Sequence, residues 1–216
     1  MSKFISEFDF AELIKKESIQ NILTSDSESI CIELSKNKKL DIISLMPFDN
    51  FIERVIEQIK SAKYDLIFLS HVFFNSGMAL ENIDHIYEIC IKEKIKLAID
   101  VRLSFFLPIN FRADYFIQTE MPTFLCTHEE VHSRQNKFRE QLPELDHFFL
   151  CEKNILSVNY NYHGAFITFA LPSNTHAKQQ QEELKQHGIC CEVIENRLRF
   201  NFLTHENFDL SFLKIK

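Results

Sequence analysis

The sequence predicts an α/β protein with a mostly parallel sheet covered by helices, followed by a small α+β unit. Two observations lead to this fold class. The stretches 64–70 (YDLIFLS) and 96–101 (KLAIDV) are apolar almost throughout, which is typical of strands that are covered on both faces in a parallel sheet. Segments with apolar residues at helical spacing lie before and between them, and strand, helix and strand in alternation favour right-handed crossovers.

The first part of the chain is expected to supply most of this sheet. Its predicted strands are 3–6, 29–35, 64–70, 96–101, 114–118 and 123–126. Three amphipathic helices are predicted between them. The first presents Phe10, Leu13 and Ile14 on one face, the second starts after Asp49 or Asn50 as N-cap, and the third starts near Asn82.

The second part of the chain has a different pattern. A polar helical segment over 128–150 is interrupted by Pro143. Beyond it the sequence predicts strands at 155–161, 163–171, 189–195 and 197–203, with a helix over 175–187 that is closed by Gly188. We therefore predict a large domain over 1–127, a connecting helical segment over 128–150 and a small α+β domain over 151–216.

The composition narrows the classes of function. A formal net charge of -7 disfavours a nucleic-acid partner, because phosphate binding needs a clustered basic surface. No apolar run reaches membrane-spanning length, so no membrane partner is expected. The six cysteines show no CxxC pair, which favours free thiols in a reducing cytoplasm over disulfides.

The segment HEEVH is the one metal-binding pattern in the sequence. His128 and His132 flank Glu129, as in zinc peptidases whose glutamate acts as general base. No obvious third ligand follows, and short motifs of this kind arise often by chance on charged helices. No metal site is therefore predicted.

Four stretches resemble a known family: ISEFDF (5–10), LIFLSHVFFNSG (66–77), LAIDV (97–101) and LRFNFLTHENFDLSFL (198–213). They are similar to the class V aminotransferase superfamily of fold-type I pyridoxal 5'-phosphate (PLP) enzymes, which includes kynureninases and cysteine desulfurases. The resemblance implies a partial PLP-transferase-like large domain, a small C-terminal domain and PLP as cofactor. In such enzymes an aspartate binds the pyridine nitrogen, a later lysine forms a Schiff base with PLP, and a C-terminal arginine meets the substrate.

The resemblance assigns roles to particular residues. Asp100 would pair with the ring nitrogen and keep it protonated, so that the ring can accept electrons from a carbanion. His71 and Asn75, with Ser76, would line the cofactor ring, and Arg199 would bind a substrate carboxylate as a planar fork. Two plainer interpretations remain open: Asp100 as a solvated strand-end residue and Arg199 as a surface residue of an edge strand.

The sequence departs from the family at the lysine. The amine should lie at or next to Pro122, but no lysine occurs between Lys96 and Lys137. A proline cannot form a Schiff base. The chain also has only three glycines, none of them in a glycine-rich phosphate-binding loop.

A further expected difference lies at the N-terminus, where the family carries a phosphate-binding segment ahead of ISEFDF. We therefore expect a degenerate or truncated relative that is not catalytically competent alone and does not bind PLP by itself. Two alternatives stay open. One is half of a split PLP enzyme, completed by a partner chain or within a homodimer; the other is a non-enzymatic α/β interaction domain.

Overall fold

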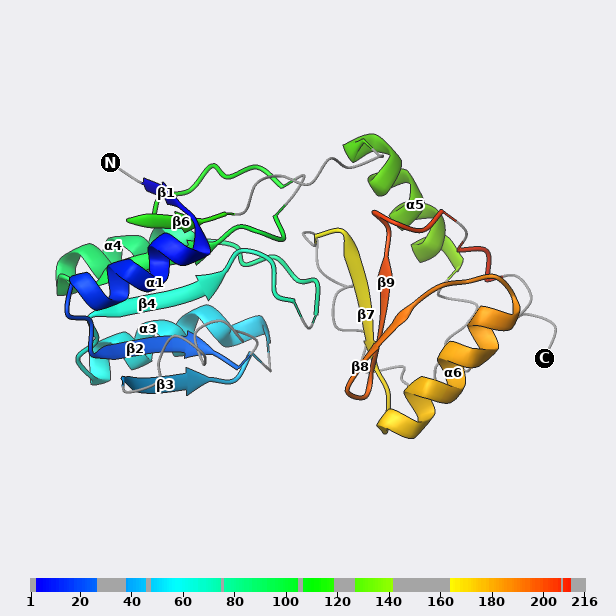
Figure 1. Cartoon of the computed structure of the whole chain (residues 1–216), viewed down its shortest axis with the longest axis horizontal. Helices are drawn as coiled ribbons and strands as arrows, with labels where there is room; N and C mark the ends of the chain where they lie inside the picture. Colours follow the sequence, from blue (N-terminus) through cyan, green and yellow to red (C-terminus); the bar gives the residue numbers. More distant parts are fainter. Residues whose placement is uncertain are drawn as a thin grey trace. The chain divides into compact units, whose positions relative to one another are not determined.

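The chain folds into two compact units, each with its own sheet (Figure 1). The computed structural model describes residues 3–26, 38–45, 48–74, 76–104, 107–118, 127–141, 164–206 and 208–210. The first unit comprises Met1–Phe74 and Leu80–Met121, and the second comprises Asn75–Ala79 and Pro122–Lys216. The predicted boundaries near residues 127 and 150 stay a prediction.

In the part of the first unit that the structure describes, a six-stranded parallel sheet forms the centre. Its strand order is β1-β6-β5-β4-β2-β3, and every neighbouring pair is parallel. The strands are β1 Lys3–Ile5, β2 Asn21–Ser25, β3 Lys39–Ile43, β4 Leu66–Ser70, β5 Lys96–Asp100 and β6 Tyr115–Ile117. All residues of β4 are buried, and so are all residues of β5 after Lys96. The predicted α/β class is therefore confirmed.

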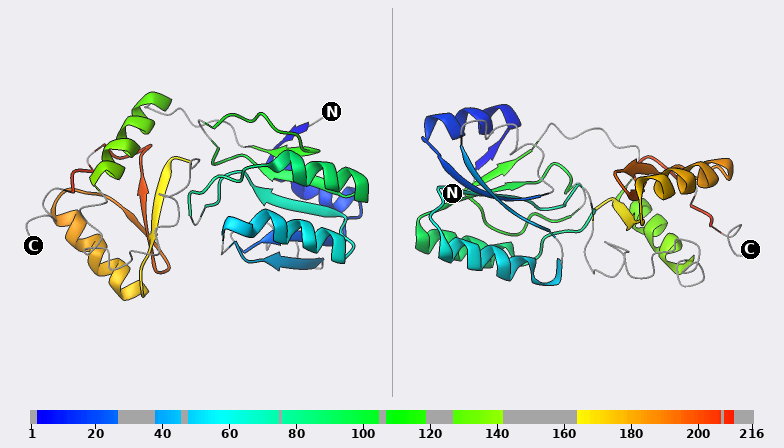
Figure 2. Two further views of the ribbon diagram at one scale, coloured as in Figure 1. Left: turned by 180° about the vertical axis from the view of Figure 1, so that it is seen from behind. Right: turned by 90° about the horizontal axis from the view of Figure 1, so that it is seen from below.

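Helices cover both faces of this sheet. Helix α1 (Glu7–Lys16) lies on one face, and α3 (Phe51–Ser61) and α4 (Ile83–Glu93) lie on the other (Figure 2). A short 3-10 turn, η1 (Phe48–Asn50), leads into α3. Asn50, one of the two predicted N-caps, precedes α3, but its side chain makes no capping hydrogen bond and instead accepts one from Arg54 Nε at 3.1 Å.

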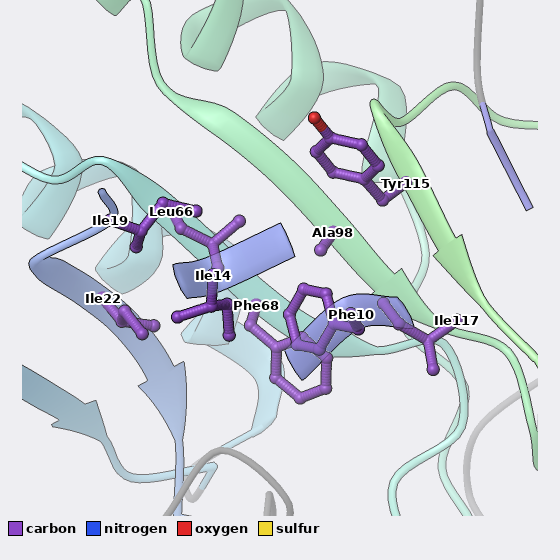
Figure 3. Packing of buried hydrophobic residues seen from close by; sticks show 9 residues of the cluster. All are labelled: Phe10, Ile14, Ile19, Ile22, Leu66, Phe68, Ala98, Tyr115 and Ile117. Carbon is purple, nitrogen blue, oxygen red and sulfur yellow. The ribbon is translucent and has the colours of Figure 1, made fainter. Parts of the chain in front are cut away.

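The start of α1 is fixed by a capping box. Ser6 Oγ accepts a hydrogen bond from Asp9 N at 3.1 Å, and Asp9 Oδ2 accepts one from Ser6 N at 3.4 Å. The helix then buries Phe10 and Ile14 against strands β2, β4, β5 and β6 (Figure 3). The Phe10 and Phe68 rings stack with centroids 5.1 Å apart. This packing places the first turn of α1 near the carboxyl ends of the central strands.

Within the described residues, the second unit has a three-stranded antiparallel sheet in the order β7-β9-β8. Its strands are β7 Phe166–Ala170, β8 Glu192–Ile194 and β9 Arg197–Asn201, and its helices are α5 His128–Gln141 and α6 Asn174–Gln186. The fully buried Phe138 of α5 packs against phenylalanines of the sheet and of the segment after it: Phe169, Phe200, Phe202 and Phe208. Gly188 follows α6 with φ of 75°, as a helix-ending glycine should.

Two strands were not predicted from the sequence, namely β2 and β3. Both are short and interleave polar residues with apolar ones, so neither gives a continuous apolar run. The predicted strands at 29–35, 123–126 and 155–161 lie outside the described residues. No helix in the described part of the chain has the length and apolar character needed to cross a membrane.

Candidate functional site

Polar side chains gather at the carboxyl ends of the central strands in the first unit. Asp100 ends β5, opposite Ser70 of β4 and Ile117 of β6. Ser25 ends β2, and His71 directly follows β4. All these polar residues are buried. Ligands of open α/β sheets bind at the carboxyl ends of the strands, so this group of residues is the candidate site.

The Asp100 carboxylate is engaged by Arg102, two residues further along the chain. Arg102 Nε lies 3.0 Å from Oδ1 and 2.9 Å from Oδ2, and Arg102 Nη2 lies 2.5 Å from Oδ2. The backbone N–H of Arg102 donates a fourth hydrogen bond to Oδ1 at 2.9 Å. Asp100 is only 6% exposed, so its interpretation as a solvated strand-end residue is wrong.

Arg102 also reaches the first turn of α1. Its Nη1 lies 2.6 Å from Glu7 Oε2. One guanidinium therefore bridges a carboxylate at the end of β5 and a carboxylate at the start of α1. Neither Arg102 nor Glu7 was predicted from the sequence as a site residue. The D-x-R sequence at the end of β5 is the local pattern that could have indicated the Asp100–Arg102 pair. No sequence pattern near Glu7 indicates its contact with Arg102.

His71 is buried, at 5% exposed, directly after β4. Its Nδ1 shares a hydrogen bond of 2.8 Å with Ser104 Oγ, and its ring meets the Phe111 ring edge-on at 4.7 Å. Burial lowers the pKa of His71 to about 4. The imidazole is therefore neutral near pH 7, which suits a structural hydrogen bond better than a charged contact.

The side chains of His71 and Asp100 do not converge. Their backbones adjoin, since His71 N donates to Asp100 O at 2.9 Å. Asp100 shares a sheet face with Ala98 and Ile117, which α1 covers. His71 instead contacts Phe111, which packs on Phe116, and Phe116 points to the opposite face from its neighbour Ile117. The two predicted cofactor ligands therefore lie on opposite faces of the sheet.

The remaining predicted residues are distributed as follows. Asn75 and Pro122 lie outside the described residues. Ser76 is buried, and its Oγ accepts a hydrogen bond from Met78 N at 3.2 Å within a turn. His132 lies on α5, and the described residues contain no group of three or more His, Cys, Asp or Glu placed to hold a metal ion.

Arg199 belongs to the second unit and lies on the central strand β9. It is 7% exposed, so its interpretation as a surface residue of an edge strand is wrong. Its Nε donates to Glu192 Oε2 at 2.9 Å, and its Nη2 contacts the same oxygen. The guanidinium also lies over the Phe166 ring, 4.7 Å from the centroid. Its role toward a substrate carboxylate stays a prediction.

These residues can be tested against the cofactor that the resemblance implies. A ring nitrogen would need an acceptor on Asp100, but each carboxylate oxygen already accepts two hydrogen bonds from Arg102, which fills a carboxylate's usual capacity. His71 contacts the other face of the sheet. As arranged, these side chains do not fit PLP in the way that the resemblance implies.

The fold is that of the fold-type I PLP-dependent transferases. It is similar to a mutant of C-DES with glycine covalently linked to its PLP cofactor, with a TM-score of 0.64, 12% identity, and coverage of 87% of this chain and 71% of that chain. The histidinol-phosphate aminotransferase of Clostridium acetobutylicum gives a TM-score of 0.61 at 12% identity, covering 91% and 76%.

A third similar structure is the SepCysS complex with the N-terminal domain of SepCysE, with a TM-score of 0.57, 12% identity, and coverage of 86% and 70%. No family model and no curated protein matches the sequence. At such low identity these similarities establish the fold alone. Membership of class V stays a prediction.

Proposed function

We propose that this chain is a degenerate relative of the PLP-dependent transferases that performs no Schiff-base chemistry on its own. One observation carries the proposal. The sheet register pairs Asp100 with Ile117, so the chain that leaves β6 starts directly beside the carboxylate. From there to residue 136 the sequence contains no lysine, and PLP chemistry requires an amine that forms a Schiff base with the cofactor.

The lysine that precedes Asp100 cannot substitute for the missing amine. Lys96 starts β5, whereas Asp100 ends it, so the two residues lie at opposite ends of the same strand. Lys96 is also held by Asp114, with Nζ 3.3 Å from Oδ1. A strand rises about 3.3 Å per residue, so Lys96 lies four residues along β5 from Asp100, at the far end of the strand.

We propose that the chain binds a ligand or a partner protein on a transferase fold and catalyses no reaction by itself. The neutral, buried His71 and the internally paired Asp100 support a site kept for structure rather than for proton transfer. The free thiols of Cys90, Cys190 and Cys191 support a reducing compartment, and we propose the cytoplasm.

The test is to incubate the purified chain with PLP, dialyse it, record its absorption spectrum, and then reduce with borohydride and map the peptides. We expect no stoichiometric long-wavelength Schiff-base band, and only weak labelling spread over exposed lysines. A stoichiometric band that survives dialysis and maps to a single lysine would refute the proposal.

A second candidate is a PLP enzyme completed by a partner chain or by a second copy. Its support is the outer edge of the sheet: within the described residues β1 pairs only with β6. Phe4 of β1 and Phe8 of α1 are 52% and 74% exposed beside this edge. One structurally similar protein, SepCysS, was solved in a complex with the N-terminal domain of SepCysE. Exposed apolar side chains at an unpaired strand favour association.

This candidate requires the partner to provide the amine. We would purify the chain from its source with its natural partners and measure its mass in solution and its PLP content. A stable complex whose PLP is attached to a lysine of the other chain supports the candidate. A PLP-free monomer, unchanged by Phe8→Ser, counts against it.

A further inference from the structure

Two cysteines are adjacent in the connection between α6 and β8 of the second unit (Figure 1). Cys190 is exposed and Cys191 is half-buried, and both carry free thiols. Cys90, a third free thiol of the described residues, is buried within α4. The connection after α6 therefore presents a pair of neighbouring thiols to solvent.

Helix α6 holds the backbone on both sides of Cys190. Ile189 N donates to Leu184 O at 3.0 Å, and the Ile189 side chain is fully buried. Cys191 O accepts a hydrogen bond from Gln181 Nε2 at 2.8 Å. These contacts limit how far the chain can rearrange at the two cysteines.

The adjacency of the cysteines decides which chemistry suits them. Consecutive Cα atoms lie about 3.8 Å apart, whereas the Cα atoms of a disulfide usually lie about 4.4–6.8 Å apart. A direct bond between the two sulfurs would therefore strain a connection whose backbone α6 already holds. A single atom bonded to both sulfurs does not bring them into contact, so the pair suits a bridging centre better than a disulfide.

The Cys191 thiol stays protonated near neutral pH. Burial raises its pKa to about 12, and the neighbouring Cys190 and Glu192 raise the pKa as well. Peroxides react with the thiolate rather than with the thiol, so oxidation of Cys191 is disfavoured. A hydroxyl group on arsenic(III) instead condenses with S–H directly: an S–As bond forms, the As–OH bond breaks, and the proton leaves with the hydroxyl as water.

We propose that Cys190 and Cys191 form a two-point binding site for a trivalent arsenical, with one S–As bond from each cysteine. The exposed Cys190 condenses first, and Cys191 then displaces the second hydroxyl from the same arsenic. Two waters leave, and the arsenic stays trivalent throughout. The second bond is intramolecular, so the arsenical should resist exchange into a monothiol about a hundredfold better than one held by a single cysteine.

The test labels the folded full chain with phenylarsine oxide, a trivalent arsenical that can bond to two sulfurs. The labelled chain is washed with excess β-mercaptoethanol and digested with trypsin. Cleavage after Lys185 and Arg197 gives the peptide QHGICCEVIENR, which contains Cys190 and Cys191 and no other cysteine. We expect one phenylarsenic group on this peptide by mass spectrometry, and we expect ethanedithiol to remove it.

The variants Cys190→Ser and Cys191→Ser each leave a single thiol. In either variant the label should wash off with β-mercaptoethanol about a hundredfold more readily than from the wild-type chain. Cys190→Ser serves alone if Cys191→Ser does not fold, because Cys190 is exposed. Cys90→Ala is the matched control, since it removes a free thiol and leaves the adjacent pair, and its label should resist washing as in the wild-type chain.

The inference is overturned if the folded chain carries no β-mercaptoethanol-resistant label on the peptide 186–197, or if this label appears only after unfolding in urea. It is also overturned if folded Cys190→Ser keeps the label as firmly as the wild-type chain. A Schiff-base band with PLP would refute the proposed function and leave this result unaffected, because arsenical binding requires neither PLP nor a lysine.

Discussion

Arg199 lies over the ring of Phe166, 4.7 Å from its centroid, while Glu192 on the neighbouring strand holds the edge of the guanidinium. The arginine side chain is 8% exposed and the Glu192 side chain is 42% exposed. A nearly buried cation thus depends on a carboxylate that solvent can reach. In the second unit, as in the first, a residue predicted to bind a ligand is paired within its own unit.

Glu192→Ala should destabilise the second unit by about 1–2 kcal/mol, because it leaves the buried Arg199 without this carboxylate while solvent screens part of the loss. Glu195→Ala is the control, since Glu195 is 70% exposed and pairs with Arg197 at 2.9 Å. It should change the free energy of unfolding by less than about 0.5 kcal/mol. Urea unfolding of both variants checks the prediction, and equal losses would contradict it.

His71 should make stability depend on pH. Burial lowers its pKa from 6.5 to about 4 in the folded chain. Below pH 6.5 the unfolded chain takes up a proton that the folded chain refuses, so this contribution is full above pH 6.5 and is lost as pH falls toward 4. The slope should reach at most about 1.4 kcal/mol per pH unit.

The measurement is urea unfolding at several pH values across that window. His71→Gln should flatten the slope, whereas His85→Gln, at an exposed position of α4, should not. Identical pH profiles for the wild-type chain and His71→Gln would show that another group causes the dependence.

Thr24→Val should stabilise the first unit by about 1 kcal/mol. Thr24 on β2 is fully buried, and its Oγ1 has no hydrogen-bond partner in the described part of the chain. Valine has nearly the same shape and removes the cost of an unsatisfied hydroxyl. Thr24→Ser keeps the hydroxyl and loses a methyl group, so it should destabilise. Thermal unfolding midpoints of the two variants and the wild-type chain test the prediction. A lower midpoint for Thr24→Val than for the wild-type chain would disprove the predicted stabilisation.

Gly77→Ala should destabilise the second unit by more than Gly188→Ala. Both glycines have φ of 75°, so each replacement costs about 1 kcal/mol of backbone strain. At Gly77 a Cβ would also lie 2.7 Å from the carbonyl oxygen of Phe166, which forces the β7 backbone to shift. Denaturant midpoints of the two variants, compared with the wild-type chain, test this ranking.

The fold class was predictable because its central strands carry the clearest pattern. Residues 64–70 and 96–101 are apolar almost throughout, and they form the middle of the sheet, where both faces are covered. Strands β2 and β3 were missed because Asn21, Thr24 and Asp41 interrupt their apolar residues. Their burial depends on partners that the local sequence does not reveal.

The candidate site was predictable only in part. The end of an apolar strand gave the position of Asp100, since ligands of parallel sheets bind there. Its pairing with Arg102 depends on a turn and on side-chain torsions, and the contact with Glu7 joins residues far apart in the sequence. The separation of His71 and Asp100 onto opposite faces follows from strand register, which short motifs do not encode.

The pairing of β1 with β6 has a consequence for synthesis on the ribosome. Lys3–Ile5 is translated before its partner Tyr115–Ile117, which emerges more than a hundred residues later. At cellular rates of translation the wait is on the order of ten seconds. During that time Phe4 has no Phe116 ring to stack on, a contact of 4.9 Å in the finished fold. Until β6 emerges, the nascent chain therefore carries an unpaired, phenylalanine-bearing strand, and this is the stage at which a chaperone would matter most.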